Sequence, residues 1–135
     1  MRDILFRGLT KTKTWIEGWF CGGTCDSPDG DVKQCFVIID KNTLFWFDVD
    51  PDTIGQYTGV VDRKGQKIFE GDIVRNVNNG KTAIVKWYEE HAAFMLYCHS
   101  ENKVYWFWDN DFDVIEVIGD AHRNPELLEG GARND

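Results

Sequence analysis

Short runs of apolar and aromatic residues recur along the chain, and residues that form turns bound each run. The clearest pair flanks Asn78-Asn79-Gly80, with one run at 68–77 and the other at 81–88. An Asn-Gly pair between two strand-like runs favours a β-hairpin, because both residues tolerate the positive φ of a tight turn. The second run alternates apolar and polar positions, as a strand with one buried face does. We therefore predict an antiparallel hairpin over residues 68–88.

Further runs of this kind predict a mainly β fold. The run at 15–20 is expected to end at Gly22-Gly23, and a long loop dense in turn formers then leads to residues 35–39. Aromatic residues make up 14% of the chain, and they fit a pleated sheet better than a helix. Short strands in close succession predict a small barrel or sandwich with little helix and an SH3-like C-terminal part. The remaining predicted strands lie at 4–6, 44–49, 94–98, 104–108 and 113–118.

The pattern also suggests a division of the chain. Residues 1–54 are expected to form an N-terminal β subdomain, and residues 55–128 an SH3-like β barrel. Residues 129–135 are polar and rich in glycine, so we expect a flexible tail. The alternative is one compact unit over the whole chain.

The charge limits the partners of the protein. Fifteen basic and 23 acidic residues give a formal net charge of −8, which repels nucleic acid at long range. No apolar run approaches the ~20 residues of a membrane-spanning helix, and the first residues lack the apolar core of a signal peptide. We expect no membrane association and a cytoplasmic location.

Four cysteines, at positions 21, 25, 35 and 98, permit two readings. A reducing cytoplasm favours free thiols. The alternative is a zinc site built from Cys21, Cys25 and Cys35, with Cys98 or His99 as the fourth ligand. The spacing Cys21-x3-Cys25 suits zinc, but no second close pair follows, so we favour free thiols.

No catalytic constellation or cofactor motif stands out. The serines, at 27 and 100, lack the glycine-flanked elbow of a hydrolase nucleophile. Glu70 and Asp72 flank Gly71 at the start of a strand, where a carboxylate can pin a turn by accepting backbone hydrogen bonds. The same two carboxylates acting in hydrolysis are the enzymatic alternative.

One candidate interaction surface combines aromatic and acidic residues. Trp106 and Trp108 share one face of a predicted strand, and Asp109 and Asp111 follow directly. Aromatic faces beside negative charge attract the lysines and arginines of a partner. Burial of both strand faces between sheets is the alternative. The aspartates also open like a calcium loop, but the Gly and Glu of such a loop are missing.

A second candidate surface is the trio Gln56, Tyr57 and Thr58 between two glycines. A polar, aromatic, polar sequence at that point suits contact with a ligand or a neighbouring subunit. Tyr57 would equally suit a position in the core.

Two segments carry a resemblance to a known family. VDPDTIGQYTG at 49–59 and DRKGQKIFEGDIV at 62–74 closely resemble the YopX family. Residues 2–8 are similar to its start, and residues 116–120 and 124–128 to its end. The resemblance implies a gene carried by bacteriophages and prophages, a bacterial host cell, and a β-rich fold that forms an oligomer. It supplies no catalytic residues.

These observations favour a noncatalytic phage or prophage accessory protein that forms homo-oligomers and engages a host or phage protein. A small-barrel nucleic-acid-binding protein, whose aromatic residues stack on bases, is the alternative that the acidic charge opposes.

Overall fold

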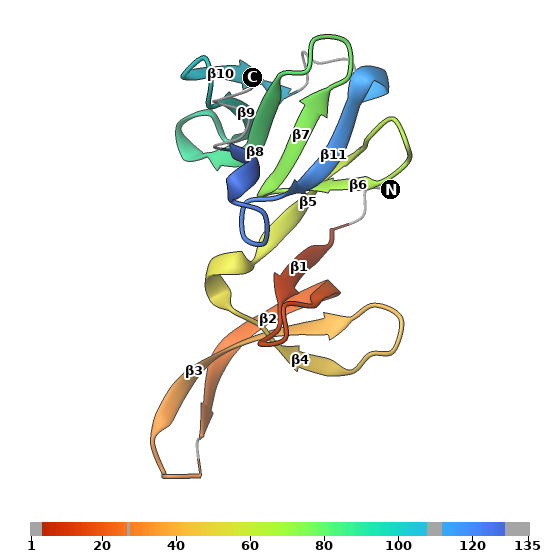
Figure 1. Ribbon diagram of the computed structural model, residues 1–135. Helices are drawn as coiled ribbons and strands as arrows, with labels where there is room; N and C mark the ends of the chain where they lie inside the picture. The colour runs from red at the N-terminus through yellow and green to blue at the C-terminus, as the bar shows by residue number, and fades with distance from the viewer. Residues whose placement is uncertain (1–3, 27, 108–111, 129–135) are drawn as a thin grey trace. The chain divides into compact units, whose positions relative to one another are not determined.

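The computed structural model describes residues 4–26, 28–107 and 112–128, and its elements are almost entirely strands (Figure 1). Every paired strand runs antiparallel to its neighbour. The predicted mainly β fold with little helix is thereby confirmed. Over these residues, no helix is long and apolar enough to cross a bilayer. The strands are β1 (Phe6–Leu9), β2 (Trp15–Asp26), β3 (Val32–Asp40), β4 (Trp46–Asp48), β5 (Gly55–Val61), β6 (Lys67–Phe69), β7 (Asp72–Asn76), β8 (Thr82–Tyr88), β9 (Ala93–Cys98), β10 (Lys103–Trp106) and β11 (Ile115–Asp120).

Contacts divide the chain into two units, an N-terminal unit at Met1–Gln56 and a C-terminal unit at Tyr57–Asp135. The division falls inside β5, two residues beyond the boundary expected from the sequence. Short 3₁₀ helices connect strands: η1 at Pro51–Thr53, η2 at Glu89–His91 and η4 at Phe112–Val114.

In the N-terminal unit, the strands follow the order β4-β3-β2-β1, and the start of β5 pairs with β1. The dominant feature is the long β2–β3 hairpin, drawn in orange in Figure 1, which pairs from Gly18 with Asp40 to Asp26 with Val32. The predicted end of the first strand at Gly22-Gly23 is therefore wrong. Residue-by-residue pairing with β3 carries both glycines through the strand, despite their low strand propensity. The core on one face contains Ile16, Ile38 and Val49.

In the C-terminal unit, a five-stranded sheet has the order β10-β9-β8-β7-β11, and β6 pairs with β5. The predicted hairpin around Asn78-Asn79-Gly80 is confirmed, because β7 pairs with β8 from Ile73 with Ile84 to Arg75 with Thr82. Gly80 has a φ of 75°, the left-handed conformation that glycine allows without strain. The SH3-like character stays a prediction. The core contains Ile68, Val74, Val85, Leu96, Phe107 and Ile115.

Candidate functional site

The predicted trio Gln56, Tyr57 and Thr58 lies in β5 and is buried or half-buried. Tyr57 is 8% exposed, and its ring lies 5.6 Å from the ring of Phe69. The hydroxyl of Thr58 donates to the carbonyl oxygen of Ile68 at 2.8 Å, while Gln56 is half-buried. Tyr57 thus lies in the core, which was the alternative considered from the sequence.

The aromatic and acidic surface predicted at 106–111 falls partly outside the described residues. Trp106 ends β10 with 39% of its surface exposed, and its ring centroid lies 5.0 Å from that of His91. Trp108, Asp109 and Asp111 lie outside the described residues. The exposed indole of Trp106 remains as the described part of this predicted surface.

The cysteines do not form the arrangement expected from the sequence. Cys35 is disulfide-bonded, so the prediction that it is a free thiol is wrong and its sulfur is not available to bind zinc. Cys21 is an exposed free thiol and Cys98 a buried one. Within the described part of the chain, no three His, Cys, Asp or Glu side chains are grouped to hold a metal ion.

An unpredicted cluster of exposed apolar side chains lies on the N-terminal unit. We call it the apolar edge: Trp19, Leu44, Phe45 and Trp46, which are 48%, 62%, 68% and 69% exposed. Trp19 on β2 pairs with Ile39 on β3, and Ile39 pairs with Trp46 on β4. Residues directly opposite each other point to the same face of a sheet, so both tryptophans lie on one face.

A tight turn holds the apolar edge in place. The carboxylate of Asp40 accepts the backbone N–H groups of Asn42 at 2.8 Å and Thr43 at 2.9 Å. The hydrogen bond from Thr43, followed by that from Asn42, lowers the pKa of Asp40. Leu44 has a φ of 65°, a left-handed conformation that costs a non-glycine residue roughly 1–2 kcal/mol. A bulky exposed leucine in this conformation suggests a role outside the fold.

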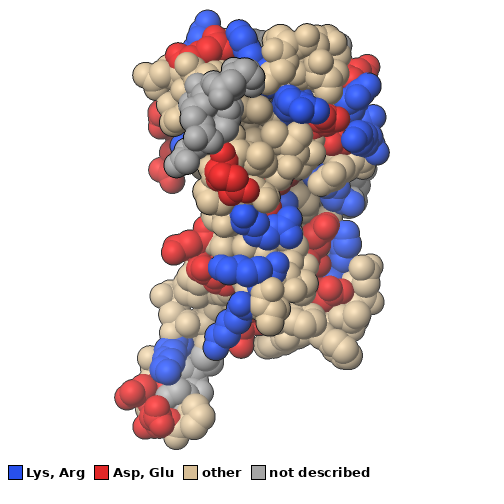
Figure 2. All heavy atoms as spheres, in the orientation of Figure 1, with Lys and Arg blue, Asp and Glu red and all other residues tan. Residues whose placement is uncertain are grey.

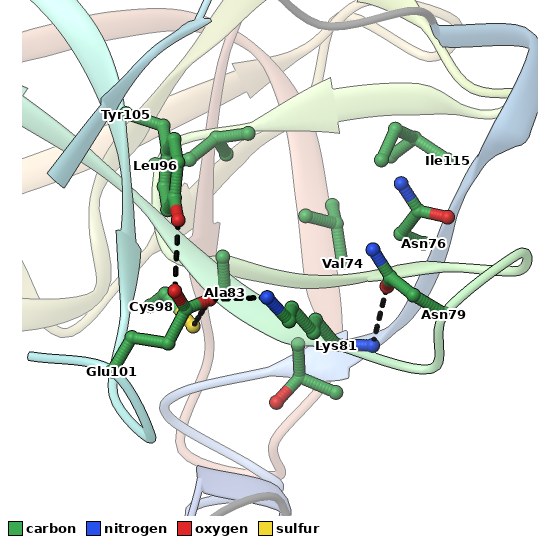
Figure 3. A pocket seen from close by; sticks show the side chains of 11 residues that line it. Val74, Asn76, Asn79, Lys81, Ala83, Leu96, Cys98, Glu101, Tyr105 and Ile115 are labelled. Atoms are coloured by element: carbon green, nitrogen blue, oxygen red, sulfur yellow. Dashed lines mark hydrogen bonds and ion pairs between the residues drawn. The ribbon is translucent and has the colours of Figure 1, made fainter. Parts of the chain in front are cut away.

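A pocket of about 160 Å³ opens in the C-terminal unit, among the ends of several strands (Figure 3). Its floor is part of the core of that unit, and polar side chains form its rim. The lining residues are Val74, Asn76, Asn79, Lys81, Thr82, Ala83, Leu96, Cys98, Glu101, Tyr105 and Ile115.

Glu101 is the centre of the polar rim. Its carboxylate pairs with the Lys81 ammonium at 3.0 Å and accepts the Tyr105 hydroxyl at 2.9 Å (Figure 3). The hydrogen bond from Lys81, then that from Tyr105, lowers the pKa of Glu101, and Glu101 in turn raises the pKa of both partners. These shifts move all three groups further from titration near neutral pH.

Sequence reasoning missed this pocket, although one signal was present. Lys81 directly follows the β7–β8 turn, and Glu101 lies in the β9–β10 turn. In consecutive antiparallel hairpins, every second turn lies at the same end of the sheet. Had the consecutive predicted strands been taken as successive hairpins, the two charged residues would have been placed at the same end of one sheet.

Comparison with known proteins identifies the family. The YopX protein family model matches residues 6–129. The chain belongs to the YopX family. The resemblance noted at residues 49–74 is thereby confirmed. The fold is similar to a solved structure: the crystal structure of protein EF1440 from Enterococcus faecalis aligns with a TM-score of 0.53 and 22% identity, covering 95% of this chain and 99% of that chain. At this identity the likeness concerns the fold alone, and no curated protein matches the chain.

Proposed function

We propose that this YopX-family chain is a noncatalytic phage or prophage accessory protein that self-associates through its apolar edge and, as an assembly, engages a host or phage protein. The exposure of three consecutive apolar residues, Leu44, Phe45 and Trp46, carries the proposal. Single exposed apolar residues are ordinary on protein surfaces, but contiguous groups of them mark interaction sites.

The adjacent strand supports a second copy as the occupant. β4 pairs with β3 on one side, and within the described strands nothing pairs with its other side. An edge strand presents unpaired N–H and C=O groups that can pair with an identical strand of another copy. A two-fold contact of this kind would bring both copies of Trp46 to one interface.

The test is the mass of the protein in solution, measured by light scattering after size-exclusion chromatography. Wild type is expected to run as an oligomer, and Trp46→Glu to dissociate at least about tenfold more readily, because it buries a charge in an apolar contact. Trp46 is 69% exposed, so the change leaves the folded monomer intact. Phe45→Ser provides a second, uncharged disruption of the apolar edge.

Val104→Glu is the matched control. Val104 is 39% exposed on β10 of the C-terminal unit, and its substitution adds the same charge away from the apolar edge. Wild type that stays monomeric at every concentration, or equal dissociation of Val104→Glu and Trp46→Glu, would refute self-association through this surface.

A further inference from the structure

The pocket of the C-terminal unit has room for one ring-sized apolar group. Its volume is about 160 Å³, close to the roughly 150 Å³ of an engineered apolar cavity that binds benzene. Apolar side chains drawn from four strands make up its floor, and all except Ala83 are at most 4% exposed. The floor residues are Val74, Ala83, Leu96 and Ile115.

Asn76 at the end of β7 and Asn79 in the β7–β8 turn present hydrogen-bond donors to this space. The Oδ1 atom of Asn76 accepts the N–H of Asn78 at 2.8 Å, and that of Asn79 accepts the N–H of Lys81 at 2.9 Å. These bonds fix both side-chain amides, and Figure 3 shows the Nδ2 atoms on the side that faces Val74. Because an amide nitrogen only donates, the pocket gains donors here.

The remaining rim groups add to this excess of donors. Both carboxylate oxygens of Glu101 already accept hydrogen bonds, Oε1 from Lys81 and from the Cys98 thiol and Oε2 from Tyr105. The Lys81 ammonium has three donors, and the ion pair with Glu101 occupies one. A ligand that accepts hydrogen bonds is therefore better matched to the rim than one that donates them.

We propose that this pocket binds a small monocarboxylate whose apolar part is about the size of one aromatic ring. The ring lies on the floor formed by Val74, Leu96 and Ile115, and the carboxylate accepts hydrogen bonds from the amides of Asn76 and Asn79 and from Lys81. This site is independent of the apolar edge, which belongs to the other unit of the chain.

Benzoate is the first probe, titrated into ¹⁵N-labelled protein while backbone amide signals are recorded by NMR. We expect saturable shifts at residues 74–83 and 96–105, with a dissociation constant in the millimolar range that suits so small a ligand. Benzylammonium has a similar size and carries donors in place of acceptors, so it should bind at least about tenfold more weakly. Absence of saturation by benzoate, or equal binding of both probes, would overturn the proposal.

Asn79→Asp and Asn78→Asp are the matched variants. Asn79→Asp keeps the oxygen that accepts the N–H of Lys81 but removes the Nδ2 donor and adds a negative charge, so benzoate affinity should fall at least about tenfold. Asn78 is exposed and is not among the lining residues, so Asn78→Asp adds the same charge one residue away and should change affinity by less than about threefold. Equal weakening by both variants would show that the asparagine donor is not part of a site.

Discussion

Asp62 shows how one buried carboxylate can connect distant parts of a small β structure. Its Oδ1 atom accepts the N–H groups of Lys64 at 2.8 Å and Gln66 at 2.9 Å, and its Oδ2 atom accepts the N–H of Val117 at 2.9 Å. The side chain therefore closes the turn between β5 and β6 and ties that turn to β11. Burial would raise the pKa of Asp62, but the three backbone hydrogen bonds outweigh it, and the pKa is lowered.

This lowered pKa predicts a pH-dependent contribution to stability. A carboxylate with a lower pKa in the folded state stabilises it above the unfolded pKa of about 3.9, and the contribution disappears as pH falls through the folded pKa. Asp62→Asn should lower the free energy of unfolding at pH 7 by about 1–3 kcal/mol, because an amide nitrogen then faces backbone donors. In urea unfolding at pH 3, the free energies of unfolding of Asp62→Asn and wild type should differ by less than they do at pH 7.

The exposed Asp29→Asn serves as the control for Asp62→Asn, and we expect it to leave unfolding within about 0.5 kcal/mol of wild type. If the free energies of unfolding of wild type and Asp62→Asn differ by the same amount at pH 7 and at pH 3, the charge of Asp62 does not have this role.

Sequence indicated a side-chain hydrogen bond where the two bonded residues are close along the chain. Asp72 was expected to pin the turn beside Gly71, and its Oδ2 atom accepts the N–H of Phe69 at 2.8 Å. The bond from Val117 to Asp62 spans 55 positions, and no local pattern indicates it. The pocket was missed because its rim combines residues from two hairpins, so finding it requires the order of the strands in the sheet as well as each hairpin.

At the scale of elements, the β2–β3 hairpin depends on close backbone approach at one glycine. A Cβ atom placed on Gly18 would lie 1.8 Å from the carbonyl oxygen of Ile39 and 3.0 Å from the backbone nitrogen of Lys41. Gly18 also pairs with Phe6 of β1, so it lies within three adjacent strands. Because the obstructing atoms belong to the backbone, a side chain cannot be accommodated without breaking the pairing.

Gly18→Ala is therefore expected to destabilise the N-terminal unit by about 3 kcal/mol or more, a loss typical of severe overpacking. Hydrogen exchange of the β2 and β3 amides should be faster in this variant. Gly23→Ala is the control on the same strand, since an added Cβ there meets nothing within 4 Å. Equal exchange rates in the two variants would contradict this account of the hairpin.

Sequence predicted the existence of most strands better than their ends. The aromatic run at 44–49 contains β4, but the strand covers only Trp46–Asp48, because the turn anchored by Asp40 includes Leu44 and Phe45. That difference bears on the proposed self-association, since Leu44 and Phe45 lie exposed just before the strand and not inside it. Local propensity cannot distinguish the two positions, because the turn depends on side-chain capping.

At the scale of the whole molecule, the net charge distinguishes between the two partners considered from the sequence, a second copy of the chain and nucleic acid. The formal net charge is −8, and on the face drawn in Figure 2 acidic and basic side chains are interspersed. Identical copies of an acidic protein repel each other, and salt screens that repulsion over roughly 10 Å at 0.1 M. Nucleic-acid binding has the opposite dependence, because it releases counterions and weakens as salt increases.

A salt series therefore tests the proposed assembly against the nucleic-acid alternative. Analytical ultracentrifugation at 50 and 500 mM NaCl should show self-association that strengthens at the higher concentration, since salt screens the repulsion and leaves the contact between apolar edges intact. Gel shifts with single-stranded and duplex DNA should show no retained complex at 50 mM, where electrostatic binding is strongest. A complex that forms at 50 mM and is lost at 500 mM, together with a monomeric protein at both, would instead favour nucleic-acid binding, because only that interaction depends on released counterions.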